Sequence, residues 1–320
     1  INGQSGIYVD KNVSLKTLAS DLTINDDIVA DGTVDPTLDP IGRSDAIALE
    51  ATSGGTIRLG ADLTAGQNLT LTGAAQLTES SVLESVEADI SFSGGAVTNV
   101  DDATNERLTL VTSGSVTQTH GISVDELALQ GAGTFTLDQS NAIGVLAAGT
   151  ADTQIVELTL NNTSAMEIGT LSSQDGILAS GDISITSADL TVSQAIDTES
   201  TTNQASNSAN AITIGVTGAS NINAGVTAPG DIEFTGKTNI TGATVESSSA
   251  GISITGNGGT LSSGATLKTD TGAIVLAGNK ISVTGSGTAV ESNSGAVTVS
   301  GDDFTLDDSA TLTSDTGALT

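Results

Sequence analysis

Apolar and polar residues alternate in short runs along the chain, and between positions 230 and 320 this alternation repeats at a nearly constant interval. A glycine precedes the leading apolar run of each repeat, with successive spacings of 21, 21, 23 and 22 residues, at Gly230, Gly251, Gly272, Gly295 and Gly317. A unit of this length cannot bury its own apolar face and gains a core only by stacking on its neighbours. The pattern therefore predicts a stack of similar coils.

Each repeat contains several alternating apolar pairs. In one of them Ile274 and Leu276 are followed by Ile281 and Val283, with a third apolar contact near Val290. Alternation with period two places these side chains on one face of a strand. We predict an all-β fold, a right-handed parallel β-helix (β-solenoid) with about 22 residues and three short strands per coil, and hence about 14 coils in 320 residues.

The pattern continues toward the start of the chain but is less regular over residues 1–180. We follow the leading apolar pair of each coil by its first residue, at Leu69, Ile90, Leu108, Leu127, Leu158, Ile183, Ile212 and Ile232. Two stretches break the pattern and predict loops that leave the core, 26–44 with its two Asp-Pro steps and 197–210, which lacks large apolar side chains. A third candidate excursion is 142–154. The short run 81–89 fits a strand better than a helix.

We interpret residues 1–320 as a single β-solenoid, with its most regular repeats at 230–320. The first residue is Ile1 and the last residues fall part of the way into a repeat. The sequence is therefore expected to be a fragment of a longer chain.

Composition narrows the function. Aromatic residues make up 2% of the chain and there is no Trp, which suits a narrow core of Val, Ile, Leu and Ala. There is no Cys, so disulfides and thiolate metal sites are excluded. The formal net charge of −30 and the scattered Lys and Arg residues argue against binding to nucleic acid or to anionic membranes. The sequence contains no run of 18 apolar residues, so it predicts no membrane-spanning helix.

The sequence offers little catalytic chemistry. His120 is the single histidine, in a turn-like context, and predicts a solvated side chain. Paired carboxylates such as Asp101 with Asp102 could serve acid–base chemistry on a polysaccharide, but aromatic and basic residues that would hold a sugar are scarce. We therefore predict no enzymatic activity, no catalytic residue and no cofactor. Calcium is the one candidate ion, and its candidate ligands are Asp302, Asp303, Asp307 and Asp308.

Three segments, Gly181–Ile185, Gly230–Ile232 and Gly272–Leu276, open with Gly-Asp-Ile or Gly-Ala-Ile. They resemble the repeats of filamentous haemagglutinin-like adhesins, large bacterial exoproteins exported by two-partner secretion. The resemblance covers most of the chain and is strongest from Ile183 onward. It implies a cysteine-poor β-helical shaft located outside the cell, at the bacterial surface.

Three classes of function remain open. The first is a structural or adhesive segment of a secreted surface protein, a stiff shaft or a matrix- or filament-forming unit, with a surface-layer or sheath subunit as a related version. Its partners would be other copies of itself or cell-surface and matrix components. The second is a binding module whose loops 26–44 and 197–210 contact a glycan or a host protein. The third is a polysaccharide-degrading β-helix enzyme or phage tailspike.

Overall fold

The computed structural model describes residues 7–8, 11–30, 45–100, 105–198 and 210–320. This part of the chain contains 35 strands and no helix. It divides into two compact units, unit 1 with residues 1–145, 152–155 and 159–161, and unit 2 with residues 146–151, 156–158 and 162–320. Together the units hold about 12 turns of a β-solenoid.

The strands of unit 1 are short, mostly three to ten residues. They are β1 (Ile7–Tyr8), β2 (Val13–Leu18), β3 (Leu22–Ile24), β4 (Ile28–Ala30), β5 (Ile47–Thr52), β6 (Thr56–Leu59), β7 (Leu63–Ala65), β8 (Leu69–Leu77), β9 (Ser81–Ser85), β10 (Ile90–Asn99), β11 (Arg107–Thr112), β12 (Ser115–Gln118) and β13 (Ile122–Gln130). Two further strands contribute residues to both units, β14 (Thr134–Ala148) and β15 (Glu157–Asn162).

The remaining strands belong to unit 2. They are β16 (Ala165–Ile168), β17 (Thr170–Leu171), β18 (Gln174–Asp175), β19 (Ile177–Leu178), β20 (Ile183–Ser187), β21 (Asp189–Val192), β22 (Ile196–Asp197), β23 (Ile212–Ile222), β24 (Val226–Ala228), β25 (Ile232–Thr241), β26 (Thr244–Ser247), β27 (Ile252–Gly256), β28 (Gly259–Ser262), β29 (Thr266–Thr269), β30 (Ile274–Gly278), β31 (Lys280–Val283), β32 (Ala289–Ser292), β33 (Val297–Ser300), β34 (Asp303–Leu306) and β35 (Thr311–Ser314).

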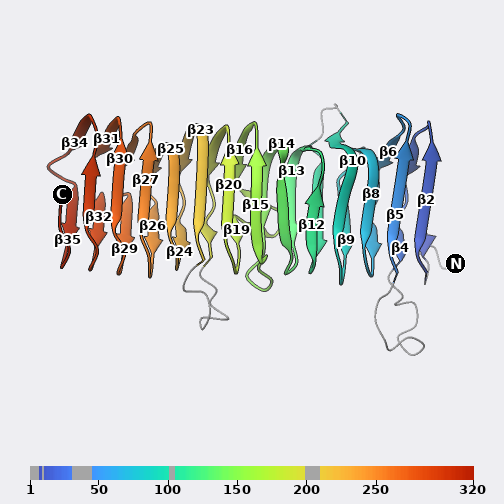
Figure 1. Cartoon of the computed structure of the whole chain (residues 1–320), viewed down its shortest axis with the longest axis horizontal. Helices are drawn as coiled ribbons and strands as arrows, with labels where there is room; N and C mark the ends of the chain where they lie inside the picture. The colour runs from blue at the N-terminus through green and yellow to red at the C-terminus, as the bar shows by residue number, and fades with distance from the viewer. Residues whose placement is uncertain (1–6, 9–10, 31–44, 101–104, 199–209) are drawn as a thin grey trace. The chain divides into compact units, whose positions relative to one another are not determined.

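Strands of successive turns pair in parallel, as the sequence predicts. In unit 2, β20, β23, β25, β27, β30 and β33 follow one another side by side (Figure 1). Their first residues form a buried aliphatic column, Ile183, Ile212, Ile232, Ile252, Ile274 and Val297. Because side chains alternate across a strand, the same register fills the interior and leaves polar residues outside. Among the described strands, β17 and β18 form an antiparallel pair.

Two further interior columns complete the core of unit 2. One column follows β21, β23, β25, β28 and β31 in register and contains Val192, Ile222, Ile240, Leu261 and Val283. The other follows β22, β24, β26, β29 and β32 and contains Ile196, Val226, Val245, Leu267 and Val290. Each of these side chains is at most 1% exposed. The core is thus narrow and continuous from turn to turn, which explains why so few aromatic residues are needed.

The two segments predicted as loops, 26–44 and 197–210, include residues that belong to strands. Residues 28–30 form β4, with Ile28 and Ala30 fully buried against β7, so the excursion at 26–44 does not begin at 26. Residues 31–44 lie outside the described residues. At the other loop, Asp197 ends β22 and Thr198 is buried, while 199–209 lie outside the described residues.

The predicted excursion at 142–154 is wrong over its first half, because β14 continues without interruption to Ala148. Ile143 and Leu146 are fully buried, so this segment contributes to the core. Residues 81–85 are strand β9, as predicted. The structure has about 12 turns in place of about 14, because some turns are longer than 22 residues: 34 residues separate the paired Val13 and Ile47, and 29 separate Ile183 and Ile212.

The predicted order of leading pairs holds in unit 2, and in unit 1 it fails at the step from Ile90 to Leu108. Ile90 pairs with Leu69, as predicted, but its partner in the following turn is Val116. Leu108 lies in β11, and its partners in register are Ser81 of β9 and Leu127 of β13. The several alternating apolar pairs within one turn look alike in sequence, so the sequence pattern does not distinguish the pair at Leu108 from the pair that stacks on Ile90.

Candidate functional site

The four aspartates that the sequence nominates for calcium lie in and around β34. Asp302, Asp303, Asp307 and Asp308 are all exposed. Asp303 faces Lys280 in register, and their charged groups are 3.8 Å apart. Within the described residues, no group of three or more acidic or histidine side chains is placed to hold a metal ion. The arrangement provides an acidic turn without a cation cage.

Asp307 accepts hydrogen bonds from its own turn and from the preceding one. Its Oδ1 accepts hydrogen bonds from the backbone N–H and the hydroxyl of Ser309, at 3.1 and 3.2 Å, and its Oδ2 accepts one from the N–H of Gly285. These bonds favour the charged carboxylate and lower the pKa of Asp307. The role that the contacts support is the closing of a corner between adjacent turns.

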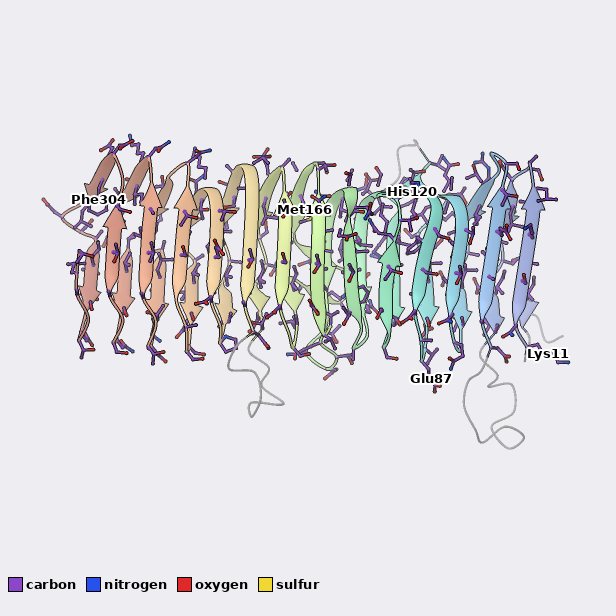
Figure 2. All side chains as sticks on the ribbon, viewed as in Figure 1. Lys11, Glu87, His120, Met166 and Phe304 are labelled. Atoms are coloured by element: carbon purple, nitrogen blue, oxygen red, sulfur yellow. The ribbon has the colours of Figure 1, made fainter. Side chains whose placement is uncertain are left out.

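His120 is an exposed turn residue, as the sequence predicts, and lies at the periphery of the strands in Figure 2. Its Nδ1 is 3.0 Å from the hydroxyl of the preceding Thr119.

Corner carboxylates and amides recur throughout the described chain. Asp89, Asp182 and Asp231 each stand just before a strand, and their Oδ1 atoms accept the N–H of Ser115, Ala211 and Gly251 in the next turn. The distances are 2.7, 2.8 and 2.8 Å. The Gly-Asp-Ile openings in the sequence are thus turn-to-turn clamps, a role that is hidden until the register of successive turns is known.

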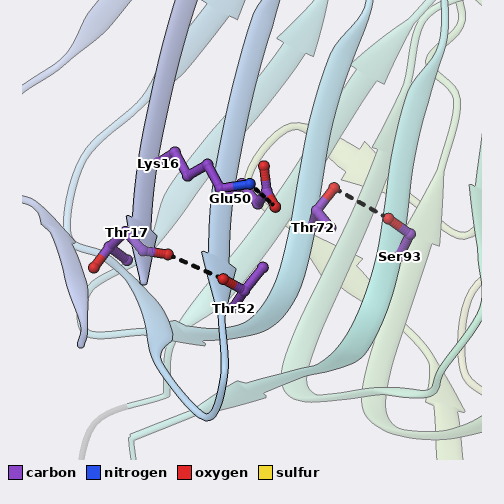
Figure 3. A network of polar contacts seen from close by, with 6 residues as sticks. All are labelled: Lys16, Thr17, Glu50, Thr52, Thr72 and Ser93. Atoms are coloured by element: carbon purple, nitrogen blue, oxygen red, sulfur yellow. Dashed lines mark hydrogen bonds and ion pairs between the residues drawn. The ribbon is translucent and has the colours of Figure 1, made fainter. Parts of the chain in front are cut away.

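Basic residues pair with acids one turn away. Lys16 and Glu50 face each other in register, with 2.7 Å between Nζ and Oε1 (Figure 3). The other ion pairs among the described residues are Arg58 with Asp21, Arg107 with Glu126, Lys268 with Glu246, and Lys280 with Asp303. Most of the few basic side chains therefore form ion pairs with acidic residues of the same chain. The remaining acidic residues give the surface an excess of negative charge.

Hydroxyl groups form an outward row along β8, β10, β12 and β14 in unit 1. Thr70 faces Ser91, with 3.1 Å between their hydroxyl oxygens, and the row continues through Thr117 and Thr136. The adjacent pair, Thr72 and Ser93, is 3.2 Å apart (Figure 3). The row therefore mixes threonine with serine and is not a uniform threonine array.

Other predicted sites fall outside the described residues. Asp101 and Asp102 do so, as do residues 31–44 and 199–209 of the two loops. Among the residues that are described, no helix is long and apolar enough to span a membrane.

The fold and the contacts define a β-solenoid repeat protein, held together by aliphatic columns and turn-to-turn polar clamps. Comparisons with protein-family models, with curated proteins and with solved structures find no match for this chain.

Proposed function

We propose that this chain is a non-enzymatic structural or adhesive segment of a large secreted bacterial surface protein, in which stacked turns act as a stiff β-helical shaft. The repeats that resemble those of filamentous haemagglutinin-like adhesins support this proposal, and so does the described fold. The proposed location is the extracellular side of the bacterial surface.

One observation carries the proposal: the core is the same in consecutive turns. From Ile183 to Val297 the leading interior position is occupied by a β-branched aliphatic residue in the paired strands of six successive turns. Stability in such a stack is close to a sum over turns and their interfaces. A chain of this kind gains length and stiffness with each turn, which is what a shaft requires.

Electron microscopy of the purified protein, combined with immunolabelling of the cells that produce it, tests the proposal. We expect narrow elongated particles that are unchanged by calcium chelation, and label outside the cell. Label confined to the cytoplasm would contradict the proposed location. Ordered sheets in both samples would favour a surface-layer subunit instead, and release of sugars from a polysaccharide would favour an enzyme.

A further inference from the structure

A shallow hollow of about 450 Å³ lies on the outward face of unit 2, where β25, β27 and β30 run side by side. It is lined by residues from three successive turns. They are Asp231, Ile232, Glu233, Gly251, Ile252, Ser253, Ala273 and Val275.

The hollow exists because small residues follow a larger one at the same corner. Asp231 precedes β25, whereas Gly251 and Ala273 occupy the equivalent positions before β27 and β30. The side chains that would fill the space are therefore absent from two consecutive turns, while Ile232 and Ile252 below remain buried in the core.

The floor is apolar at a position where neighbouring turns are polar. The outward row contains Thr213, Glu233, Ser253, Val275 and Thr298, in register. Val275 is half-buried and is the only large aliphatic residue in this row. An apolar side chain on a solvated sheet face offers a contact for an apolar group.

The other end of the hollow is acidic. Asp231 and Glu233 are both exposed, and neither takes part in an ion pair among the described residues. Oδ1 of Asp231 accepts the N–H of Gly251 at 2.8 Å, which fixes the carboxylate at the rim of the hollow. Two carboxylates are too few for a calcium cage but suit an ammonium group.

We propose that this hollow receives a lysine side chain from a basic partner polypeptide. Its four-carbon stem would lie over Ala273 and Val275, and its ammonium group would meet Glu233 and Asp231. Glu233 and Val275 are two strands apart, about 10 Å at the usual strand spacing, which an extended lysine and a glutamate side chain can bridge together. This interaction goes beyond the proposed shaft and does not depend on it.

Methyl- and amide-detected NMR of the intact chain tests the proposal, with a tetralysine peptide and its Nε-acetylated form as probes. Tetralysine is expected to shift the Val275 methyl signals saturably, and the acetylated peptide is not. Glu233→Gln should weaken binding about fivefold, as for the loss of one exposed ion pair. Val275→Ser should weaken it as well.

Glu167→Gln is the matched control, because it removes an exposed carboxylate from β16 of the same unit, away from the hollow. It should change affinity less than about twofold. Equal losses in the two Gln variants would mean general attraction to an acidic surface and would overturn the proposal, as would unshifted Val275 methyls. Asp231→Asn keeps the oxygen that accepts the Gly251 N–H, so it separates loss of charge from loss of the corner.

Discussion

Buried hydroxyl groups close one corner of the turns in unit 2. Ser247, Thr269 and Ser292 lie in register at the ends of β26, β29 and β32, and each is at most 2% exposed. Their hydroxyls donate to the carbonyls of Gly230 or Gly272, at 2.7 to 3.0 Å. These bonds satisfy backbone groups where the chain changes direction and the strand ladder cannot.

Ser247→Ala should therefore destabilise unit 2. The hydroxyl of Ser247 donates to the Gly230 carbonyl and accepts the N–H of Ala250, and both bonds would be lost within a buried corner. We expect the free energy of unfolding to fall by about 1–3 kcal/mol. Urea unfolding followed by circular dichroism measures the change. Thr213→Ala removes an exposed hydroxyl and should stay within about 0.5 kcal/mol of wild type.

Position 236 requires glycine for two reasons, a positive φ and the close approach of the Val216 backbone. Its φ is +100°, and a Cβ there would lie 2.3 Å from the carbonyl oxygen of Val216. Gly236→Ala should lower the free energy of unfolding by at least about 2 kcal/mol. At Gly225 the nearest atom to a new Cβ is 3.7 Å away, so Gly225→Ala should leave thermal stability unchanged or slightly higher. Equal effects would refute this reasoning.

Lys268 makes the stability of the fold depend on pH in the alkaline range. Its hydrogen bond with Glu246 and the charges of Glu246, Asp270 and Glu291 raise the pKa of Lys268. A raised pKa stabilises the fold fully below the unfolded value, about 10.4, and the contribution is lost as pH rises through the folded value. The pair is partly exposed, so it should contribute less than about 1 kcal/mol.

Comparison of wild type with Lys268→Gln, by urea unfolding from pH 7 to pH 11.5, isolates this contribution. The stability difference should be constant up to about pH 10 and then shrink. Lys237→Gln is the control, since Lys237 forms no ion pair among the described residues, and its difference should not vary with pH in the same way. A difference for Lys268→Gln that grows above pH 10 would contradict the assignment.

At the scale of elements, the repeated turn is the unit of construction. Ile252 and Ile274 occupy equivalent positions, 22 residues apart, in β27 and β30. The interior columns and the buried corner hydroxyls on either side of such a turn are closely alike. One turn should therefore be removable without loss of the others.

Deletion of residues 252–273 tests this directly, because it joins Gly251 to Ile274 and restores the sequence of a corner. We expect a folded protein with a strand-rich circular dichroism spectrum and a cooperative unfolding transition. Deletion of residues 252–262 removes half a turn, places interior residues outside, and should unfold the neighbouring turns. If both deletions behave alike, the turn is not the cooperative unit.

The elements that sequence predicts best are those with local alternation. Ile232 and Phe234 are recognisable as inward-facing without any knowledge of their neighbours, and both are fully buried. Asn141 shows the limit, because an asparagine near a glycine suggests a turn. In the structure its side chain is buried within β14, donates to the carbonyls of Leu137, Gln139 and Asn161, and accepts the N–H of Ile122. Ile122 and Asn161 are about 20 residues away in sequence, so these partners cannot be inferred from the local pattern.

The candidate binding surface was not predictable for the same reason. Nothing in the local sequence singles out Gly251 or Ala273, and the hollow appears only when successive turns are aligned. The predicted calcium ligands, in contrast, are close in sequence but remain separate, exposed side chains. Proximity along the chain is a poor guide to proximity on the outside of a solenoid, where neighbours come from adjacent turns.

At the scale of the whole molecule, the main feature is the large negative net charge. The chain carries 38 acidic residues against 8 Lys and Arg, and its isoelectric point is about 4.1. Where strands pair, acids in unit 2 face neutral or basic residues. Glu246 faces Thr227 and Lys268, and Glu291 faces Lys268 and Thr313. This placement limits repulsion along each row, although the net charge remains high.

Lowering the pH should therefore promote self-association. As the carboxylates are protonated, the net charge falls toward zero near pH 4.1, and the repulsion between molecules is lost. Light scattering between pH 7 and pH 3.5 should show association with a maximum close to the isoelectric point. High salt at pH 7 should produce a weaker effect by screening. Scattering that stays constant over this range would show that surface charge does not control association.

The nearly constant length of the turn over residues 230–320 also has a genetic consequence. One turn corresponds to about 66 nucleotides of coding sequence, so recombination between neighbouring repeats, which shifts the gene by whole repeats, preserves both the reading frame and the register of the strands. Variants of this gene that differ by whole turns should encode folded proteins of different lengths. Insertions of other sizes would be removed by selection unless they fall at a corner.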